Sequence, residues 1–295
     1  MCHSEESAGR RENLFYYFCA MKADRHIGIM GIVNLTDDSY FAQSRCSDTD
    51  AVLRRVGQMA DEGADVIDFG AWSSRPGSVP SGPEEEWRRL APALSAVREA
   101  FPDIRISVDT YWSSVVERTY DLIGDFLVND ISAGEDDPLM LPTVGRLGLE
   151  YVAMHKRGTS LTMQSLADYD DVVDEVIRYF EMFSAKAADA GIRRWMMDPG
   201  FGFAKNLEQN YALLSGLPSL REASAAWTLQ PSRLLVGVSR KSMIYKPLGI
   251  SPDEALEATQ AVHMAALING ADMLRVHDVK EARQVVSLYE MMALT

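Results

Sequence analysis

Gly270-Ala-Asp-Met-Leu-Arg275-Val-His277-Asp278-Val279 joins a short apolar run to two basic side chains. The run follows a glycine that can end a helix, so it is expected to form a buried strand. Arg275 and His277 are two residues apart, and on an extended chain both side chains therefore point to the same side. Two potential cations at a strand end indicate an anion site, although an ion pair with Asp272 or Asp278 explains them equally well at this point.

Strand–helix pairs of the same kind fill the chain before this segment. The predicted strands are short apolar runs at 26–33, 65–70, 104–109, 125–130, 149–155, 194–198, 232–238 and 271–276. Segments with helical periodicity separate them, at 50–62, 83–100, 113–122, about 138–147, from 172, from about 207, at 252–269 and from 279. Eight such pairs predict an α/β chain with a single (β/α)₈ TIM barrel over residues 25–295. Residues 1–24 are expected to be a short N-terminal extension, either poorly ordered or packed as a lid.

Composition narrows the possible partners. The chain has 295 residues, is 47% hydrophobic and carries a formal net charge of −14, which argues against nucleic-acid binding. Its three cysteines lack the spacing of a metal site or a disulfide framework, which favours a reducing compartment. No apolar stretch approaches the roughly 18 residues of a membrane span. We therefore expect a cytoplasmic protein that acts on small molecules.

Polar side chains end nearly every predicted strand. In (β/α)₈ barrels the chemistry lies at this face, because the carboxyl ends of all the strands meet there. A whole ring of polar strand ends predicts a ligand bound over the barrel mouth. The residues are Asn34, Asp68, Asp109, Asn129 with Asp130, His155, Asp198, Ser239 to Lys241, and Arg275 with His277.

The motifs around these strand ends resemble those of dihydropteroate synthases. Examples are Asp198-Pro-Gly-Phe-Gly-Phe203, Gly237-Val-Ser-Arg-Lys-Ser242 and Arg275-Val-His-Asp-Val279. The resemblance implies condensation of 6-hydroxymethyl-7,8-dihydropterin diphosphate with p-aminobenzoate, giving 7,8-dihydropteroate and diphosphate in folate biosynthesis. The eight motifs occur in order, at 30–39, 70–77, 106–110, 129–132, 154–159 with 163–164, 198–203, 237–242 and 275–279.

The resemblance assigns the pterin to four residues: Asp109, Asn129, Asp198 and Lys241. A pterin presents ring N–H and exocyclic NH₂ groups along one edge, and a carboxylate can accept hydrogen bonds from both. Asp198 matches the residue at that edge, and Lys241 matches the lysine that faces the ring carbonyl. A pterin held rigidly in this way would have its reactive methylene group fixed in direction.

The resemblance assigns the diphosphate to Arg75, Arg275 and His277, and places Asn34 near a Mg²⁺ cofactor. Neutralising diphosphate makes it a good leaving group, so departure in an SN1-like step requires cations rather than a protein nucleophile. Arg75, Lys241, Arg275 and His277 are therefore the expected catalytic residues. Arg275→Ala is expected to abolish turnover while sparing the binding of a pterin without diphosphate.

The p-aminobenzoate pocket is implied by the resemblance at Ser74, Pro76, Phe203 and Ser242, with loops 36–41 and 73–77 as a moving lid. Several loop residues depart from the usual family pattern, and we expect a changed sulfonamide response from them. Alanine in place of a glycine that needs positive φ is expected to alter the backbone of two loops. The departures are Asp37, Trp72, Ser74, Ala133, Ser160 and Ala204.

Other interpretations of the chain remain open. A pterin-dependent corrinoid methyltransferase would use the same barrel without a diphosphate clamp, and a pterin-binding paralogue would bind substrate without turnover. His155 is expected to make a structural hydrogen bond under a loop. The glycine pattern ending at Lys205 is a weak phosphate-loop signal. The resemblance also implies a homodimer, for which the apolar helix at 255–268 is a suitable surface.

Overall fold

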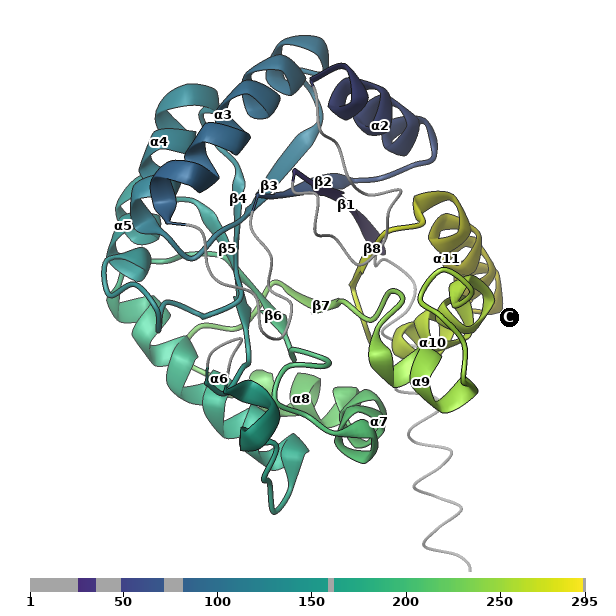
Figure 1. Cartoon of the computed structure of the whole chain (residues 1–295). Helices are drawn as coiled ribbons and strands as arrows, with labels where there is room; N and C mark the ends of the chain where they lie inside the picture. The colour runs from purple at the N-terminus through teal and green to yellow at the C-terminus, as the bar shows by residue number, and fades with distance from the viewer. Residues whose placement is uncertain (1–25, 36–48, 72–81, 159–161, 294–295) are drawn as a thin grey trace, which may run out of the picture.

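The computed structural model describes residues 26–35, 49–71, 82–158 and 162–293. Its eight parallel strands form a closed barrel in which each strand pairs with its neighbours in sequence and β1 pairs with β8 (Figure 1). The predicted TIM barrel is therefore confirmed. The strands are β1 (Gly28–Asn34), β2 (Val66–Gly70), β3 (Arg105–Asp109), β4 (Leu127–Asp130), β5 (Glu150–Met154), β6 (Trp195–Asp198), β7 (Arg233–Val236) and β8 (Met273–Val276).

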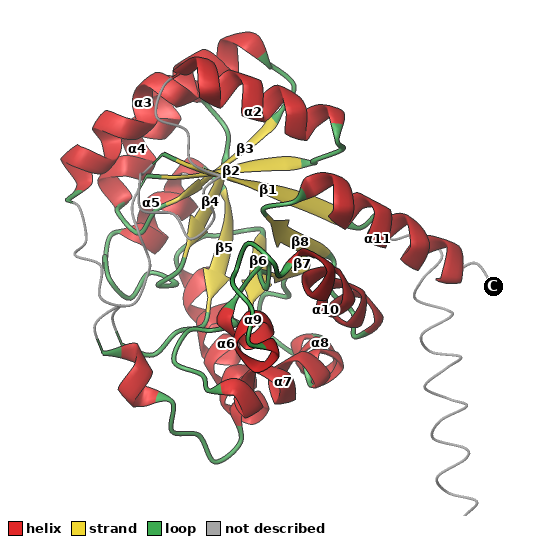
Figure 2. Cartoon of the chain, turned by 45° about the vertical axis from the view of Figure 1, so that its right-hand side comes forward, coloured by secondary structure: helices red, strands yellow, loops and turns green. Residues whose placement is uncertain are grey.

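Helices surround the strands on the outside of the barrel (Figure 2). Gly216 divides the region from 207 into two helices, and a short helix after Lys241 was not predicted. No described helix has the length and apolar character needed to cross a membrane. The helices are α2 (Thr49–Asp61), α3 (Pro83–Ala100), α4 (Ser113–Ile123), α5 (Met140–Leu147), α6 (Val172–Asp189), α7 (Leu207–Ser215), α8 (Leu217–Ser224), α9 (Ser242–Leu248), α10 (Leu256–Ile268) and α11 (Val279–Ala293).

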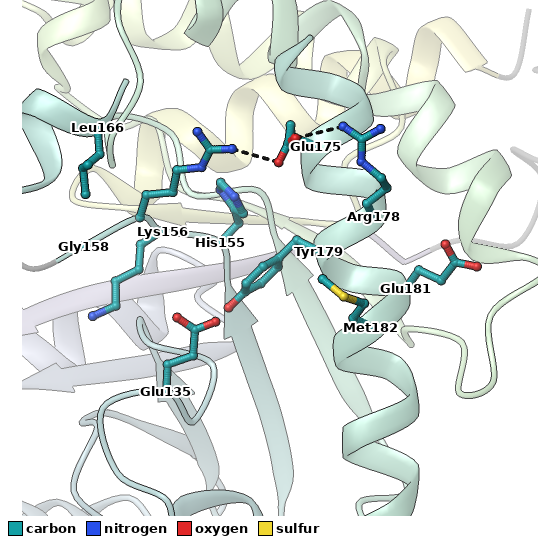
Figure 3. A pocket seen from close by; sticks show the side chains of 11 residues that line it. Glu135, His155, Lys156, Gly158, Leu166, Glu175, Arg178, Tyr179, Glu181 and Met182 are labelled. Carbon is teal, nitrogen blue, oxygen red and sulfur yellow. Dashed lines mark hydrogen bonds and ion pairs between the residues drawn. The ribbon is translucent and has the colours of Figure 1, made fainter. Parts of the chain in front are cut away.

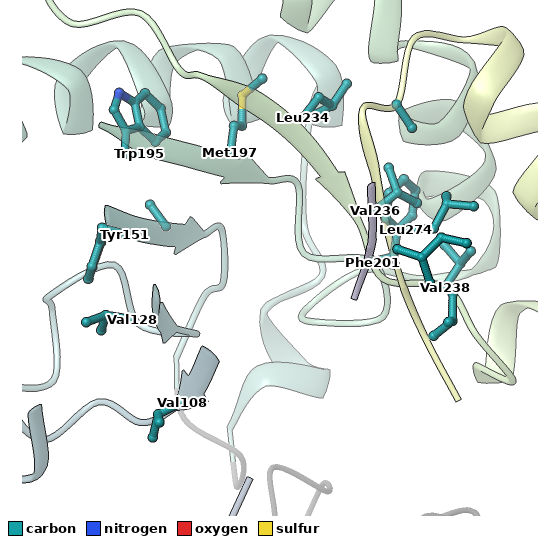
Figure 4. Packing of buried hydrophobic residues seen from close by; sticks show 14 of the residues in the cluster. Val108, Val128, Tyr151, Trp195, Met197, Phe201, Leu234, Val236, Val238 and Leu274 are labelled. Carbon is teal, nitrogen blue, oxygen red and sulfur yellow. The ribbon is translucent and has the colours of Figure 1, made fainter. Parts of the chain in front are cut away.

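The larger core fills the space between the strands and the helices. Val108, Val128, Tyr151 and Trp195 are paired in register across β3 to β6, and all are buried (Figure 4). Phe183 of α6 lies on the same layer, with its ring centroid 5.9 Å from that of Tyr151 and 4.8 Å from that of Trp195. The apolar stripe of α6 is therefore helix packing, as expected from its spacing.

A second, smaller core lies inside the barrel. It consists of one apolar side chain from almost every strand: Met30, Val66, Leu127, Val152, Met196, Leu235 and Met273. Side chains alternate between the two faces of a strand, so the residues two positions further along also face inward. Four of these are polar, and they form the base of the candidate site above the apolar layer: Asp68, Asn129, Asp198 and Arg275.

The amino-terminal end of the barrel is closed by an ion pair. Glu150 of β5 is buried and pairs with Arg105 of β3, while the hydroxyl of Ser232 donates a hydrogen bond to Glu150 at 3.2 Å. These groups lie at the start of the strands, at the opposite end from the predicted site. Residues at this end of such barrels serve stability rather than chemistry.

Candidate active site

Asp68 organises the floor of the site. Its fully buried carboxylate accepts hydrogen bonds from Ser107 Oγ at 2.6 Å, Asn129 Nδ2 at 3.0 Å and Arg275 Nε at 2.7 Å. The donors come from β3, β4 and β8, so one carboxylate ties together strands that are distant in sequence. Asp68 thereby fixes the orientation of two residues assigned to ligand binding, Asn129 and Arg275.

Arg275 has a second carboxylate partner, Asp109, whose Oδ2 lies 3.0 Å from Arg275 Nη2. The alternative of an ion pair with Asp272 or Asp278 is wrong, because Asp272 pairs with Arg221 and Asp278 with Arg240. Arg275 does form ion pairs, but its partners are Asp68 and Asp109 inside the barrel. The Arg275 guanidinium therefore already balances negative charge within the site.

His277 is a hydrogen-bonding group here, and not the second cation expected from the sequence. Ser239 Oγ accepts a hydrogen bond from the His277 backbone N–H at 3.2 Å and lies 3.0 Å from its Nδ1. Burial lowers the pKa of His277 to about 3, and the guanidiniums of Arg275 and Arg240 contribute in the same direction. At neutral pH the imidazole is uncharged, which leaves Arg275 as the cation of this pair.

Asp198 and Lys241 form the other side of the site. Asp198 Oδ1 accepts a hydrogen bond from the Gly200 N–H at 2.8 Å, and burial raises the pKa of this carboxyl against the opposing charge of Lys241. Lys241 Nζ donates to the Phe201 carbonyl at 2.6 Å and lies 4.9 Å from the centroid of the Phe203 ring. Burial lowers the pKa of Lys241 to about 8, although the Asp198 carboxylate favours its charged form.

Arg240 fixes the backbone that presents Lys241. It has a positive φ of 53° and donates from Nε and Nη2 to both oxygens of Asp278, at 2.8 and 2.9 Å. Its Nη1 donates to the carbonyls of Pro252 and Asp253, both at 2.8 Å. The sequence placed Arg240 among the polar strand ends without a role. The geometry makes it a buried tie between the β7 and β8 loops.

The other assigned residues divide between described and undescribed parts of the chain. Phe203 and Ser242 flank Lys241 as half-buried side chains, one on the β6 loop and one at the start of α9. The predictions for Ser74, Arg75 and Pro76, for the departures Asp37, Trp72 and Ser160, for the lid loops 36–41 and 73–77, and for residues 1–24 concern residues outside the described ranges.

The position of Asn34 would allow its amide oxygen to bind a metal ion that is also held by the substrate. It ends β1 opposite Gly70, and a Cβ built on Gly70 would lie 3.4 Å from Asn34 Oδ1 and 3.8 Å from Asp109 Cβ. The amide oxygen and Asp109 therefore border the same small space above Gly70. Within the described ranges no three His, Cys, Asp or Glu residues gather as metal ligands. Mg²⁺ commonly takes one or two protein oxygens together with water and substrate phosphate, so this donor set fits it.

Two departures from the family pattern retain the left-handed backbone conformation. Ala133 has φ 49° and Ala204 has φ 50°, so the expected change of backbone does not occur at these positions. The β4 loop is held by Asp130, which accepts hydrogen bonds from Ser132 N, Gly134 N and the Tyr151 hydroxyl at 2.6–2.8 Å. Strain at the alanines is therefore tolerated because the surrounding loops are fixed.

A cavity of about 670 Å³ lies beside α6 and shares His155 with the ring of strand ends (Figure 3). Its wall includes Arg157 and Arg178, and both pair with Glu175, at 2.8 and 2.9 Å. Arg157 also stacks on the Tyr169 ring at 3.8 Å from its centroid. The cationic groups of this cavity already have partners, so it offers no clear anion site.

Two buried ionisable residues have no predicted role in the site: Glu86, which the sequence did not single out, and Lys205, which carried only the weak phosphate-loop signal. Within the described part of the chain neither carboxyl oxygen of Glu86 has a hydrogen-bond partner of good geometry, and burial raises its pKa to about 8 despite the nearby Thr110. Its signal was its position: it starts the buried stripe of α3 that continues through Leu90, Ala93, Leu94 and Val97. In the sequence Glu86 is only the last of three consecutive glutamates in the first turn of the helix, where acidic side chains are generally favourable.

Known proteins with similar sequences are pterin binding enzymes, in agreement with the geometry of the site. The sequence matches the family model described as pterin binding enzyme over residues 30–277. The chain belongs to this family. Among curated pterin binding enzymes, the dihydropteroate synthase of Escherichia coli (strain K12) is 37% identical over 267 residues, covering 90% of this chain and 91% of the relative. That of Neisseria meningitidis serogroup B is 38% identical over 272 residues, covering 90% and 93%.

Solved pterin binding enzymes share the whole fold. The Yersinia pestis dihydropteroate synthase in a sulfonamide drug complex has a TM-score of 0.82 at 35% identity, covering 91% of this chain and 94% of that one. The Thermus thermophilus dihydropteroate synthase in complex with 4-aminobenzoate has a TM-score of 0.78 at 36% identity, covering 90% and 95%. The predicted family and its transferase activity as a dihydropteroate synthase of folate synthesis are thus confirmed.

Proposed function

We propose that this pterin binding enzyme joins 6-hydroxymethyl-7,8-dihydropterin diphosphate to p-aminobenzoate through the residues of the barrel mouth described above. The observation that carries the proposal is that Asp198 lies beside Arg275 and near Lys241. A Cβ on Gly237 would lie 3.9 Å from Asp198 Oδ2 and 3.8 Å from Arg275 Cβ, and burial raises the pKa of Asp198 against the opposing charge of Lys241. A carboxylate and an ammonium on one side, with a guanidinium nearby, match the donors and acceptors of a pterin that bears an anionic leaving group.

The pterin would lie between the two walls of the site. Asp198 would accept hydrogen bonds from the N–H edge. Lys241, which has three N–H donors and gives one to the Phe201 carbonyl, would donate another to the ring carbonyl. Asp109 and Asn129 would contact the opposite edge, supported from below by Asp68. Asp109, Asn129 and Asp198 come from strands and Lys241 from the start of α9, so the ring would be held rigidly while its methylene carbon faces the open end.

Departure of the diphosphate would be assisted by Arg275, His277 and Arg75. The C–O bond breaks with its electron pair leaving on the diphosphate, and the electron-rich pterin stabilises the methylene cation. The aniline nitrogen of p-aminobenzoate then forms the C–N bond and loses a proton. Magnesium, when bound near Asn34, would neutralise part of the diphosphate charge.

The aniline would enter beside Phe203 and Ser242, with Ser74 and Pro76 completing its pocket. Support comes from the Thermus thermophilus relative, which was solved with 4-aminobenzoate. We also propose that the loop departures change the response to sulfonamides. Inhibition constants for a sulfonamide series, measured beside those of the E. coli relative, test this, and equal constants would contradict it.

Two further proposals concern the state of the protein. We propose a homodimer formed through the late helices, because α10 and α11 expose the large apolar side chains of Ile268, Leu288 and Met291. Light scattering after size-exclusion chromatography measures the mass directly. We propose that the enzyme acts in the cytoplasm, where the pattern of its cysteines suits a reducing environment.

One assay tests the proposed reaction against both alternatives. Purified protein is incubated with the pterin diphosphate, p-aminobenzoate and Mg²⁺, and dihydropteroate is quantified by chromatography. Product formation that falls at least about a hundredfold in Asp198→Asn supports the proposal. Tight binding of the pterin diphosphate without product would instead identify a paralogue without turnover. A second incubation, with a methylated folate and a corrinoid in place of these substrates, would identify the methyltransferase if the methyl group moved to the corrinoid.

A further inference from the structure

Lys205 is a buried lysine beneath the loop that joins β6 to α7. Its side chain is not among those assigned to the substrates or the metal, and only 5% of the residue is exposed. Nζ lies 2.9 Å from the Gly200 carbonyl oxygen, 3.0 Å from the Phe203 carbonyl oxygen and 3.0 Å from His155 Nδ1. None of these three partners is a carboxylate, which is unusual for a buried lysine.

The donors and acceptors of this cluster match one to one. A lysine ammonium has three N–H donors and no acceptor, and here it meets two carbonyl oxygens and one ring nitrogen. Burial lowers the pKa of His155 well below its usual value, so the ring is neutral and can accept at Nδ1 while Nε2 carries the proton. Because all three donors contact the protein, Lys205 is not a phosphate-binding lysine, and the weak phosphate-loop signal is wrong for it.

The loop above Lys205 has a backbone that needs such support. Gly200, Gly202 and Ala204 have positive φ of 72°, 82° and 50°. The backbone also approaches β5 so closely that a Cβ on Gly200 would lie 1.9 Å from the His155 carbonyl oxygen. Alternating left-handed residues are not held by a regular ladder of hydrogen bonds, so their conformation depends on the contacts that the loop carbonyls receive.

Further hydrogen bonds hold Lys205 and the β6–α7 loop in place. Asn210 Nδ2 of α7 donates to the Lys205 carbonyl at 3.1 Å, and its Oδ1 accepts from the Gly202 N–H at 2.7 Å. Lys241, at the start of α9, donates to the Phe201 carbonyl of the same loop. The carbonyls of residues 200 and 203 therefore accept from Lys205, and that of residue 201 accepts from Lys241. Lys205 holds the carbonyl of Phe203, the residue whose ring faces Lys241.

We propose that Lys205 and His155 form a clamp that holds the β6–α7 loop in the conformation required for p-aminobenzoate binding. Lys205 is a positioning residue: it sets the Phe203 backbone, and Phe203 in turn borders the aniline pocket. This inference rests on the proposed assignment of Phe203 to that pocket. Asp109, Asn129 and Asp198 lie at strand ends, and Asp198 and Lys241 each make one contact with the loop, at the Gly200 N–H and the Phe201 carbonyl. Phe203 lies on the loop itself, so loosening the clamp should affect p-aminobenzoate more than the pterin diphosphate.

Three variants test the clamp. Lys205→Met keeps the apolar stem and removes all three donors. His155→Leu removes the acceptor, whereas His155→Asn can place an amide oxygen near the position of Nδ1. Lys156→Met is the matched control, since Lys156 is a buried lysine next to His155 that pairs with Asp136 and makes no described hydrogen bond to the loop.

The readout is the KM for each substrate together with kcat, measured at pH about 6 because burial lowers the pKa of Lys205 to about 7. Lys205→Met is expected to raise the KM for p-aminobenzoate at least about tenfold, with the KM for the pterin diphosphate within about twofold of wild type. His155→Leu should raise the KM for p-aminobenzoate about fivefold, as expected for one lost hydrogen bond, and His155→Asn should recover most of that loss. Lys156→Met should change neither KM.

Equal increases in both KM values, or equal behaviour of His155→Asn and His155→Leu, would overturn the clamp. If Lys205→Met does not fold, which thermal unfolding would show, the two His155 variants still decide the question. Failure of the wild-type protein to form dihydropteroate would contradict the proposed reaction instead. An active wild type with an unaffected Lys205→Met contradicts the clamp alone.

Discussion

Arg275 serves both the frame of the barrel and the proposed chemistry. Its guanidinium donates to Asp68 and Asp109, and Asp68 is fully buried. Removing one partner of a buried pair leaves the other charge without compensation. Arg275→Ala is therefore not a clean test of diphosphate binding, as the sequence alone had suggested, because the variant also disturbs Asp109 on the pterin side.

We expect Arg275→Ala to lower the free energy of unfolding by about 2 to 3 kcal/mol, after allowing for the partial exposure of the guanidinium. Adding Asp68→Asn should recover part of this loss, because the amide removes the unpaired charge and can still accept from Ser107. Urea denaturation of the two single variants and the double variant gives the coupling energy. Additive losses would show that Asp68 and Arg275 do not depend on each other.

Lys241 gives the enzyme a predicted pH dependence. Burial lowers its pKa to about 8, so the ammonium is present below that pH and is lost as the pH rises through it. The value of kcat/KM for the pterin diphosphate reports groups of the free enzyme and should therefore fall above pH about 8. Arginine keeps its charge to much higher pH. Lys241→Arg should therefore have a lower kcat/KM than wild type, but that value should not fall further above pH about 8.

Steady-state rates between pH about 6 and about 10 provide the measurement for both proteins. The prediction requires that kcat/KM falls with rising pH in the wild type and does not fall in Lys241→Arg. A wild-type profile that is level up to pH about 10, or a decline shared by both proteins, would mean that another group titrates.

At the scale of elements, the β6–α7 loop combines a fixed conformation with an unfavourable residue. Ala204 is fully buried at φ 50°, where an L-residue with a Cβ is strained by about 1 to 2 kcal/mol. Glycine relieves this strain but increases the entropy of the unfolded chain. Because the strain is larger than the entropic cost, glycine at position 204 should stabilise the folded protein.

Ala204→Gly is expected to raise the free energy of unfolding by about 0.5 to 1 kcal/mol. Ala261→Gly is the matched control, since Ala261 is an exposed residue inside α10 and the same change there should lower stability by about the same amount. Thermal and urea unfolding of both variants measure the two effects. A loss of stability in Ala204→Gly would show that the alanine methyl group packs favourably enough to outweigh the strain.

Strands and helices with clear periodicity were predictable, and the inward direction of strand-end residues followed from the alternation of side chains. Helix α3 begins and ends where its pattern predicted, whereas α9 has only 7 residues and gives little periodicity. The pairings inside the site were not predictable. Arg275 and Asp68 lie 207 positions apart, and only the closure of the barrel decides which carboxylates reach the guanidinium.

The state of ionisation was also beyond the sequence. His277 appeared as a cation because histidine titrates near neutral pH, but its burial next to two guanidiniums keeps it neutral. Lys205 appeared as a weak phosphate signal, although its donors are taken up by the protein. In both residues the environment, and not the residue type, decides the chemistry.

At the scale of the whole molecule, the two ends of the barrel have separate tasks. The carboxyl ends of the strands carry the site, while Glu150 and Arg105 close the opposite end. Glu150→Gln should lower the free energy of unfolding by about 1 to 2 kcal/mol, because Arg105 is partly exposed and solvent screens the pair. Both KM values and kcat should remain those of wild type. A change in any of them would show that the two ends of the barrel are coupled.

The buried Lys205 and the half-buried Lys241 have a consequence for how ligand binding is measured. Lys205 and Lys241 titrate near pH 7 and 8, so around pH 8 both are partly deprotonated before any substrate arrives. An anionic ligand favours their charged forms, and the enzyme must then withdraw protons from the buffer as it binds. The heat of binding near pH 8 should therefore change with the ionisation enthalpy of the buffer, and this dependence should disappear near pH 6. Calorimetry in two buffers would count the protons, and the number links the affinity of the site directly to the acidity of its surroundings.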